Sequence, residues 1–527
     1  MKNASFQETK SEKTIIFETN WDFTCIGIAL FSWLFIHLFR IFRFGMTIEA
    51  VHEGIETQQG FYLGMGRWGI ALWRGTFGGY GYMPWISGAI SGLAVAISCL
   101  ILIKLFRLGS KISQIVFIVM ITASPVFMHH LKFSPQADVI GIAILAATWA
   151  IWLLTSSFSI TKCILAALLM SFCMGTYQMT VFAIGSIWAV WYLSTIIIRE
   201  RKFKWAPIGR FMGVALISAI TYFCVAAILQ HSHLVTKEEL SIGEWRGDSY
   251  FHWDAVKNAP FPNNFFILCH YAVTQPFKNI LGLNFAGQWE NIFALIPVAY
   301  IIYYIARTQN DIAYKLWSTL FILVSIYVAF SISLIFINPV SHMLYMGEPF
   351  LIAGLWGVFL SLSSHLWVKK ASIILASIIF ISAAYRSTVE AQRERYGHER
   401  SMLQAAFMYA RAAQVAENAQ LQHLKIRIVG GPIYGLPLKK KVVLLPQHSA
   451  STASLPYLYW DHQSFMRFPR YYGIHDFRAA TEQEERAYAH SCQSMPIYPR
   501  PGSVKAIGDT VVIKVGELTE THSQTIE

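Results

Sequence analysis

Long runs of hydrophobic residues, separated by short polar segments, dominate the pattern of this chain. A helix of about 20 apolar residues crosses a hydrocarbon core of about 30 Å, so each run predicts a membrane-spanning helix. The predicted spans lie near residues 22–42, 85–106, 113–128, 138–156, 162–176, 179–198, 209–230, 290–306, 316–337, 349–363 and 371–386. The pattern therefore predicts a mainly α, polytopic membrane protein with about 11 spans.

Basic residues collect in alternate connectors between these runs. They are Arg107 and Lys111, Lys162, the group Arg199, Arg201, Lys202, Lys204 and Arg210, then Arg307 and Lys315, and finally Lys369 and Lys370. Positively charged loops stay in the cytoplasm during insertion, so we expect these connectors and the Lys-bearing N-terminus to be cytoplasmic. The N-terminus has no small-residue cleavage site, and we expect the first span to remain as an anchor. The loops 43–84 and 231–289 then lie outside.

The composition changes after residue 386. Residues 386–422 are charged and rich in alanine at helical spacing, which predicts a helix. The segments LKIRIVGG, KKKVVLL and TVVIKV, with Gly and Pro between them, predict short strands. We therefore expect a membrane domain over residues 1–386 and a small α+β or α/β domain over 387–527, on the external side because the number of spans is odd.

Overall composition supports the membrane assignment. Of the 527 residues, 55% are hydrophobic and only 14% are charged, whereas an ordinary soluble domain has about a quarter charged residues. The net charge of +12 would suggest nucleic-acid binding in a soluble protein, but here the basic residues set topology. Most cysteines lie within apolar runs without ligand spacing, which indicates packing residues and neither a disulfide nor a zinc site.

The first external segment is the strongest candidate for chemistry. Glu49, Glu53 and Glu56 follow the first span at spacings that place all three on one face of a short helix. A partly desolvated carboxylate beside another carboxylate has a raised pKa and is suited to accept a proton from a hydroxyl group. The sequence therefore predicts catalytic glutamates here, and the alternative is a solvated helix face.

Cationic residues follow in the same external region. Arg67, in the segment Gly66-Arg67-Trp68, presents the planar fork that suits phosphate, and its alternative is an ion pair with a local glutamate. His129, His130 and Lys132 follow a Ser-Pro break in the third predicted span, and we expect them to bind substrate with Arg67 and Trp68 unless they only extend toward water.

Two later external links have polar side chains. Gly175-Thr176-Tyr177-Gln178 interrupts an apolar stretch, where the Tyr177 hydroxyl and the Gln178 amide could hydrogen-bond a sugar. A tight turn with an interfacial tyrosine gives the same pattern. His342, in the link before the last spans, is a further candidate for substrate binding. Asp138, at the start of the next helix, is predicted to be its cap or first-turn acid.

The order of these motifs resembles a known family. An acidic segment after the first span, Gly66-Arg67-Trp68, a second span beginning at Pro84 and the later Gly-Thr-Tyr-Gln look like the serotype-converting O-antigen glucosyltransferases of bacteria and their phages. The similarity covers about residues 20–365. That family looks related to the GT-C glycosyltransferases, whose first external loop holds the catalytic Asp or Glu.

This resemblance implies a function. Glu49 matches the first of two acids in that family and Arg67 matches its arginine, whereas the second acid position is Ala50 here and the late link has His342 where an arginine is expected. The implied activity is inverting transfer of a hexose, mainly glucose, from undecaprenyl phosphate to a lipid-linked O-antigen repeat of lipopolysaccharide. The implied location is the bacterial inner membrane, with the site facing the periplasm.

Other classes of function remain open at this point. A flippase or transporter for lipid-linked oligosaccharides is the main alternative, although it favours charged residues midway along the spans and two related halves. An acyltransferase would use a histidine within a span, and His37 is the candidate, without a nearby acid in the sequence. We expect no metal and no cofactor, because the sequence has no clear ligand set.

Overall fold

The computed structural model describes most of the membrane-embedded part and the C-terminal region. The described residues are 23–42, 59–78, 84–132, 134–156, 158–200, 203–232, 234–235, 270, 274, 289–308, 311–330, 345–430 and 476–515. Glu49, Glu53, Glu56, His342 and the predicted strand KKKVVLL lie outside these residues.

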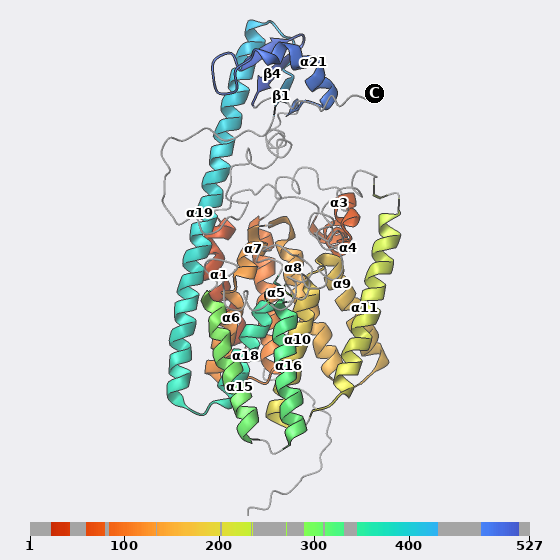
Figure 1. Ribbon diagram of the computed structural model, residues 1–527, viewed down its shortest axis with the longest axis vertical. Helices are drawn as coiled ribbons and strands as arrows, with labels where there is room; N and C mark the ends of the chain where they lie inside the picture. The colour runs from red at the N-terminus through yellow and green to blue at the C-terminus, as the bar shows by residue number, and fades with distance from the viewer. Residues whose placement is uncertain are drawn as a thin grey trace, which may run out of the picture.

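The membrane part is a bundle of helices (Figure 1). Its elements are α1 (Thr24–Phe42), α3 (Gln59–Gly64), α4 (Trp68–Trp73), the π-helix η1 (Arg74–Gly78), α5 (Pro84–Leu105), α6 (Lys111–Thr122), α7 (Pro125–Lys132), α8 (Ser134–Thr155), α9 (Ile160–Thr176), α10 (Thr180–Ser194), η2 (Thr195–Glu200), α11 (Ala206–Gln230), η3 (Trp289–Ala294), α15 (Leu295–Thr308), α16 (Ile312–Phe330), α18 (Glu348–Leu362) and α19 (Leu366–Asn418).

Each predicted apolar run coincides with a helix or with the bent pair α6–α7. Within the described residues, seven helices are long and apolar enough to cross a membrane, and the bent pair would make eight. Three further apolar helices, which correspond to α9, α15 and α18, are shorter. The mainly helical membrane fold is therefore confirmed, while the number of about 11 spans stays a prediction.

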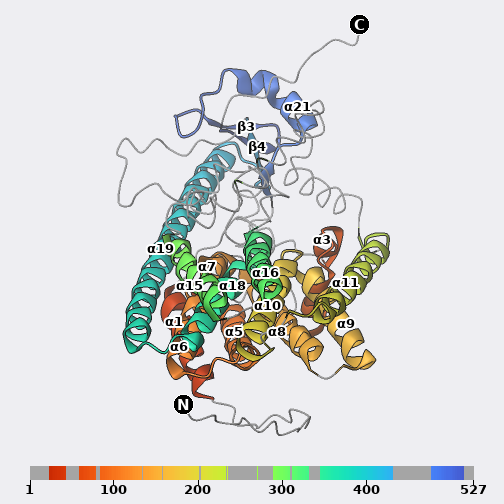
Figure 2. The ribbon, with the colours of Figure 1, turned by 60° about the horizontal axis from the view of Figure 1, so that its bottom comes forward.

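Small residues allow the central helices to pack closely. α5, α8 and α10 each have 72% of their apolar window buried, compared with 22% for α11. A Cβ on Gly141 of α8 would clash with the backbone of Ser91 on α5, and one on Gly354 of α18 would clash with Val190 on α10. Small residues at helix contacts are typical of membrane bundles, where van der Waals packing drives association. α11 and α19 lie at opposite edges of the bundle (Figures 1 and 2).

The two ends of the bundle differ in composition. α3, α4 and α7 lie at the end nearer the C-terminal domain, which we call the upper end (Figure 1). The opposite, lower end has the short connections between α5 and α6, between α8 and α9 and between α18 and α19. Arg107, Lys162 and Lys369 belong to these lower segments. The predicted separation of basic connectors from the candidate site is therefore present in the fold.

α19 joins the bundle to a C-terminal sheet. It runs 53 residues without a break, about 80 Å at 1.5 Å per residue, so the composition change at residue 386 lies inside one helix. The strands β1 (Ile426–Val429), β2 (Phe477–Ala479), β3 (Val504–Ile507) and β4 (Thr510–Lys514) form a sheet of order β2-β1-β4-β3. β1 pairs in parallel with β2 and β4, and β3 is antiparallel to β4.

Both faces of this sheet are covered. Met408 and Ala412 of α19 pack with Ile426 and Val511, and Cys492 of α21 (Glu482–Gln493) packs on the other side with Val429 and its neighbours. α21 begins with a capping box between Thr481 and Glu484. Arg478 donates two hydrogen bonds of 2.7 Å to Glu484 and so lowers the pKa of that carboxyl group to about 2. The predicted small α/β domain is present.

Candidate functional site

The short helix α4 packs onto the junction between α9 and α10. The Trp68 ring lies against Gly175, where any Cβ would collide with the indole, and Gly69 lies against Thr176 in the same way. Gly66 makes the turn before α4 with a φ of +71°, and a Cβ there would come within 2.9 Å of Tyr222 Oη. The two motifs predicted from sequence, Gly66-Arg67-Trp68 and Gly175-Thr176-Tyr177-Gln178, therefore form one packed unit.

Arg67 lies at the centre of this unit. Its Nη1 donates a 3.2 Å hydrogen bond to Gln136 Oε1 on α8, and its guanidinium carbon is 5.1 Å from the centre of the Tyr177 ring. The Tyr177 ring in turn meets His130 of α7 edge to face at 5.3 Å. His130 Nε2 lies 2.8 Å from Met346 Sδ, just before α18. These contacts connect four segments that are distant in sequence.

A buried ion pair holds the next turn of the chain. Arg74 Nη2 donates a 2.6 Å hydrogen bond to Asp138 Oδ1, and Trp73 Nε1 donates one of 3.0 Å to Asp138 Oδ2. The Arg74 and Asp138 side chains are 7% and 3% exposed. Because an unpaired charge is very costly in such surroundings, this pair fixes η1 to α8. Arg67 binds α8 two residues earlier, at Gln136.

Glutamine side chains attach the turn between α3 and α4 to its neighbours. Gln178 Nε2 donates to the Met65 carbonyl oxygen at 2.9 Å and to Tyr222 Oη at 3.1 Å. Gln230 Nε2, at the end of α11, donates to the Gly64 carbonyl oxygen at 2.8 Å. Both amide hydrogens of Gln178 are thereby used in holding this turn.

The structure brings together five of the predicted site residues: Arg67, Trp68, His130, Tyr177 and Gln178. His129 is buried on the same helix as His130. Lys132 is the last residue of that helix, and its side chain is not among those that the structure describes. The three glutamates lie between α1 and α3. Because α1 ends and α3 begins at the upper end of the bundle, the glutamate segment connects two points at that end (Figure 1).

Asp138 has a different role from the one predicted. α8 begins at Ser134 and has no acid in its first turn, so Asp138 is not a cap or a first-turn acid but the partner of Arg74. The sequence analysis also missed Arg74, Gln136 and Tyr222. Arg74 directly follows the apolar helix α4, which is a signal, because a cation beside an apolar segment needs a partner.

Metal binding is not indicated by the described part of the chain. No three His, Cys, Asp or Glu side chains are grouped there closely enough to hold an ion. The three glutamates of the first external segment lie outside the described residues. A cation at this end of the bundle is supplied by Arg67.

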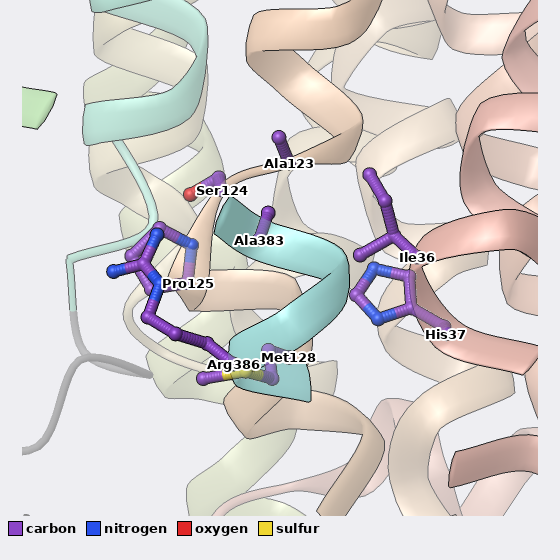
Figure 3. A pocket seen from close by; sticks show the side chains of 8 residues that line it. All are labelled: Ile36, His37, Ala123, Ser124, Pro125, Met128, Ala383 and Arg386. Atoms are coloured by element: carbon purple, nitrogen blue, oxygen red, sulfur yellow. The ribbon is translucent and has the colours of Figure 1, made fainter. Parts of the chain in front are cut away.

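A recess lies between α1, the bend that joins α6 to α7, and α19 (Figure 3). His37 lies on one side of it and Arg386 on the other, beside Pro125. The ring nitrogens of His37 lie 3.4 Å from Ser387 Oγ and 3.3 Å from the Thr122 carbonyl oxygen. Both nitrogens are thus engaged in holding α1, α6 and α19 together, which argues against the acyltransferase reading of His37.

The upper end therefore offers a cation beside aromatic and imidazole rings, in surroundings of low dielectric. A guanidinium in such a place attracts a phosphate more strongly than it would in water. The rings of Tyr177 and His130 are buried beside this cation. This arrangement is suited to binding a phosphate-linked, partly apolar ligand.

Comparison with known proteins places most of the membrane part in one family. Residues 38–347 match the family model described as "Glucosyl transferase GtrII". No curated protein and no solved structure matches the chain. The matched region contains α4, α7, α8 and the α9–α10 junction, and therefore every described contact of Arg67 and Arg74.

We predict that breaking the Arg74–Asp138 pair destabilises the protein. Asp138→Asn or Arg74→Ala should each lower the free energy of unfolding by about 3 kcal/mol, because one buried charge loses its partner. The double substitution Arg74→Met with Asp138→Leu should recover most of the melting temperature of the purified protein. Lys425→Ala, which removes an exposed pair with Asp509, is the control and should have little effect. Equal melting of Asp138→Asn and the unchanged protein would contradict this role.

Proposed function

Since this chain belongs to the glucosyl transferase GtrII family, we propose that it transfers a hexose, in the first place glucose, from undecaprenyl phosphate to a hydroxyl group of the lipid-linked O-antigen repeat. The family membership favours a glucosyltransferase over the flippase that the sequence left open. The contact of Arg67 with Tyr177, beside His130, is the observation that carries the proposal. It supports the proposal because arginine is suited to phosphate and because α1 ends and α3 begins at the same end of the bundle.

The distribution of charge supports a periplasmic site. Basic residues occur in the lower connectors, as cytoplasmic loops require, while the contacts of Arg67 lie at the upper end. The bacterial periplasm contains no nucleotide sugars. A donor that reaches this face therefore has to arrive on a lipid carrier, and undecaprenyl phosphate combines the phosphate that Arg67 suits with an apolar tail that suits the bundle.

The proposed reaction is a single displacement. The acceptor oxygen attacks the anomeric carbon from the face opposite the phosphate, so that configuration inverts. The bond between that carbon and the phosphate oxygen breaks, and its electron pair stays on the undecaprenyl phosphate. The proton of the acceptor hydroxyl goes to a carboxylate, Glu49 first, with Glu53 or Glu56 as the second acid.

Arg67 stabilises the negative charge that develops on the departing phosphate. His130, with His129 and Lys132 on the same helix, adds positive charge or hydrogen-bond donors beside the Tyr177 ring. Tyr177 and the carbonyl oxygen of Gln178 contact the sugar, and Trp68 holds α4 in place against Gly175. His342 belongs to the link before α18 and completes the proposed binding set.

Glu49→Gln should remove transfer almost completely. We expect a loss of about a thousandfold, within the range for removal of a general base, with normal amounts of protein in the membrane fraction. Transfer of labelled hexose from undecaprenyl phosphate to the acceptor measures the effect, with Glu53→Gln and Glu56→Gln in parallel. Full activity of Glu49→Gln together with loss in Glu53→Gln would move the base to Glu53.

Arg67→Ala should impair use of the donor more than use of the acceptor. The loss of a charge-assisted contact worth about 2 kcal/mol corresponds to about a 30-fold decrease in kcat/KM for the donor. Gln136→Ala is the matched control, because it removes the protein contact of Arg67 and keeps the charge. Equal losses in both variants, or equal losses for donor and acceptor, would show that Arg67 is structural.

A further inference from the structure

A recess at the lower end of the bundle lies far from the proposed transfer site. It is enclosed by the last turn of α8, by α10 and by the start of α11, and it has a volume of about 300 Å³ including the space that opens to its surroundings. Trp188 and Trp191 line one side of it, and Arg210 and Phe211 line the other. The proposed reaction does not use these residues.

Arg210 presents its charge to this recess. Its Nη1 donates a hydrogen bond of 3.4 Å to the Leu154 carbonyl oxygen, and its guanidinium carbon lies 4.8 Å from the centre of the Phe158 ring. A guanidinium has five N–H groups. Within the described part of the chain, Arg210 uses one of them in the hydrogen bond to Leu154, so most of its donors are left for a ligand. The planar fork of arginine matches phosphate geometry.

An aromatic cluster borders the recess beside Arg210. The Trp188 ring stacks on Phe211 at 4.4 Å and on Tyr192 at 5.5 Å, with interplanar angles of 10° and 5°. Trp188 is largely buried in this stack and Trp191 is half-buried, so the parts of the two indoles that remain accessible form the apolar side of the recess, beside the Arg210 cation. A ligand that matches both features has an apolar body and an anionic head.

The position of the recess identifies the kind of ligand. α11 lies at the edge of the bundle in both views (Figures 1 and 2), and most of its apolar window is exposed. The recess thus opens where the membrane surrounds the protein. Lys162, whose Nζ donates to Ser156 Oγ at 3.0 Å, and Lys204, whose carbonyl oxygen accepts from Tyr192, add positive charge around it. Positive charge at this boundary attracts anionic lipid.

We propose that this recess binds the phosphodiester of an anionic phospholipid in the leaflet at the lower end. The phosphate oxygens accept hydrogen bonds from Arg210, and the glycerol and the upper acyl carbons lie against Trp188 and Trp191. The bound lipid joins the ends of α8, α10 and α11 at the basic side of the bundle. This site is separate from the proposed donor site, which lies at the upper end.

Native mass spectrometry of the purified full-length protein tests this site. The protein is titrated with phosphatidylglycerol and, separately, with phosphatidylcholine. The unchanged chain should retain phosphatidylglycerol preferentially, and Arg210→Ala should weaken that binding about tenfold, as expected for loss of a charged hydrogen bond. Lys370→Ala, which removes an exposed cation at the same end, is the matched control and should bind as the unchanged chain does.

A second variant tests the apolar side of the recess and does not depend on the folding of Arg210→Ala. Trp191→Leu keeps the cation, removes part of this apolar side and should also weaken retention of phosphatidylglycerol. Three results would overturn the proposal: equal loss in Arg210→Ala and Lys370→Ala, equal retention of the two lipids, or displacement of phosphatidylglycerol by undecaprenyl phosphate at equal concentration. The last result would assign the recess to the donor lipid.

Discussion

A buried charge in a membrane protein has to be paired, and this requirement determines the position of the chain that follows the first span. Arg74 can be accommodated beside an apolar helix because Asp138 accepts a hydrogen bond from it, and the other oxygen of Asp138 accepts one from Trp73. The pair fixes η1 to α8. Because Gly69 and Gly175 have no side chains, α4 can pack closely against the α9–α10 junction. Arg67 reaches Gln136 and Tyr177 as a consequence of this packing.

Small residues at helix contacts and hydrogen-bonded polar side chains also hold together the rest of the molecule. Because Gly141 and Gly354 have no side chains, α8 packs closely on α5 and α18 packs closely on α10 through van der Waals contacts. His37 links α1, α6 and α19 through one imidazole ring. α19 then continues out of the bundle as a single helix and provides one face of the core of the C-terminal sheet. The two domains are therefore connected through a continuous rigid element.

Much of the fold could be predicted from sequence because hydrophobic runs and alternating strands have clear periods. The motif residues Arg67, His130, Tyr177 and Gln178 could be predicted as a group because each follows or precedes a span on the same side. The Arg74–Asp138 pair could not, since its members are 64 positions apart and each has a plausible local role. The composition change at residue 386 does not end a helix, because the alanine-rich sequence beyond it continues α19.

The central claim is that the donor phosphate binds Arg67 at the upper end of the bundle. An experimental structure with an undecaprenyl-phosphate-linked hexose, or an unreactive analogue, tests this most directly. The account predicts phosphate density within hydrogen-bond distance of the Arg67 guanidinium, with the sugar beside Tyr177 and the glutamate segment. Phosphate density among the basic connectors at the lower end would contradict it.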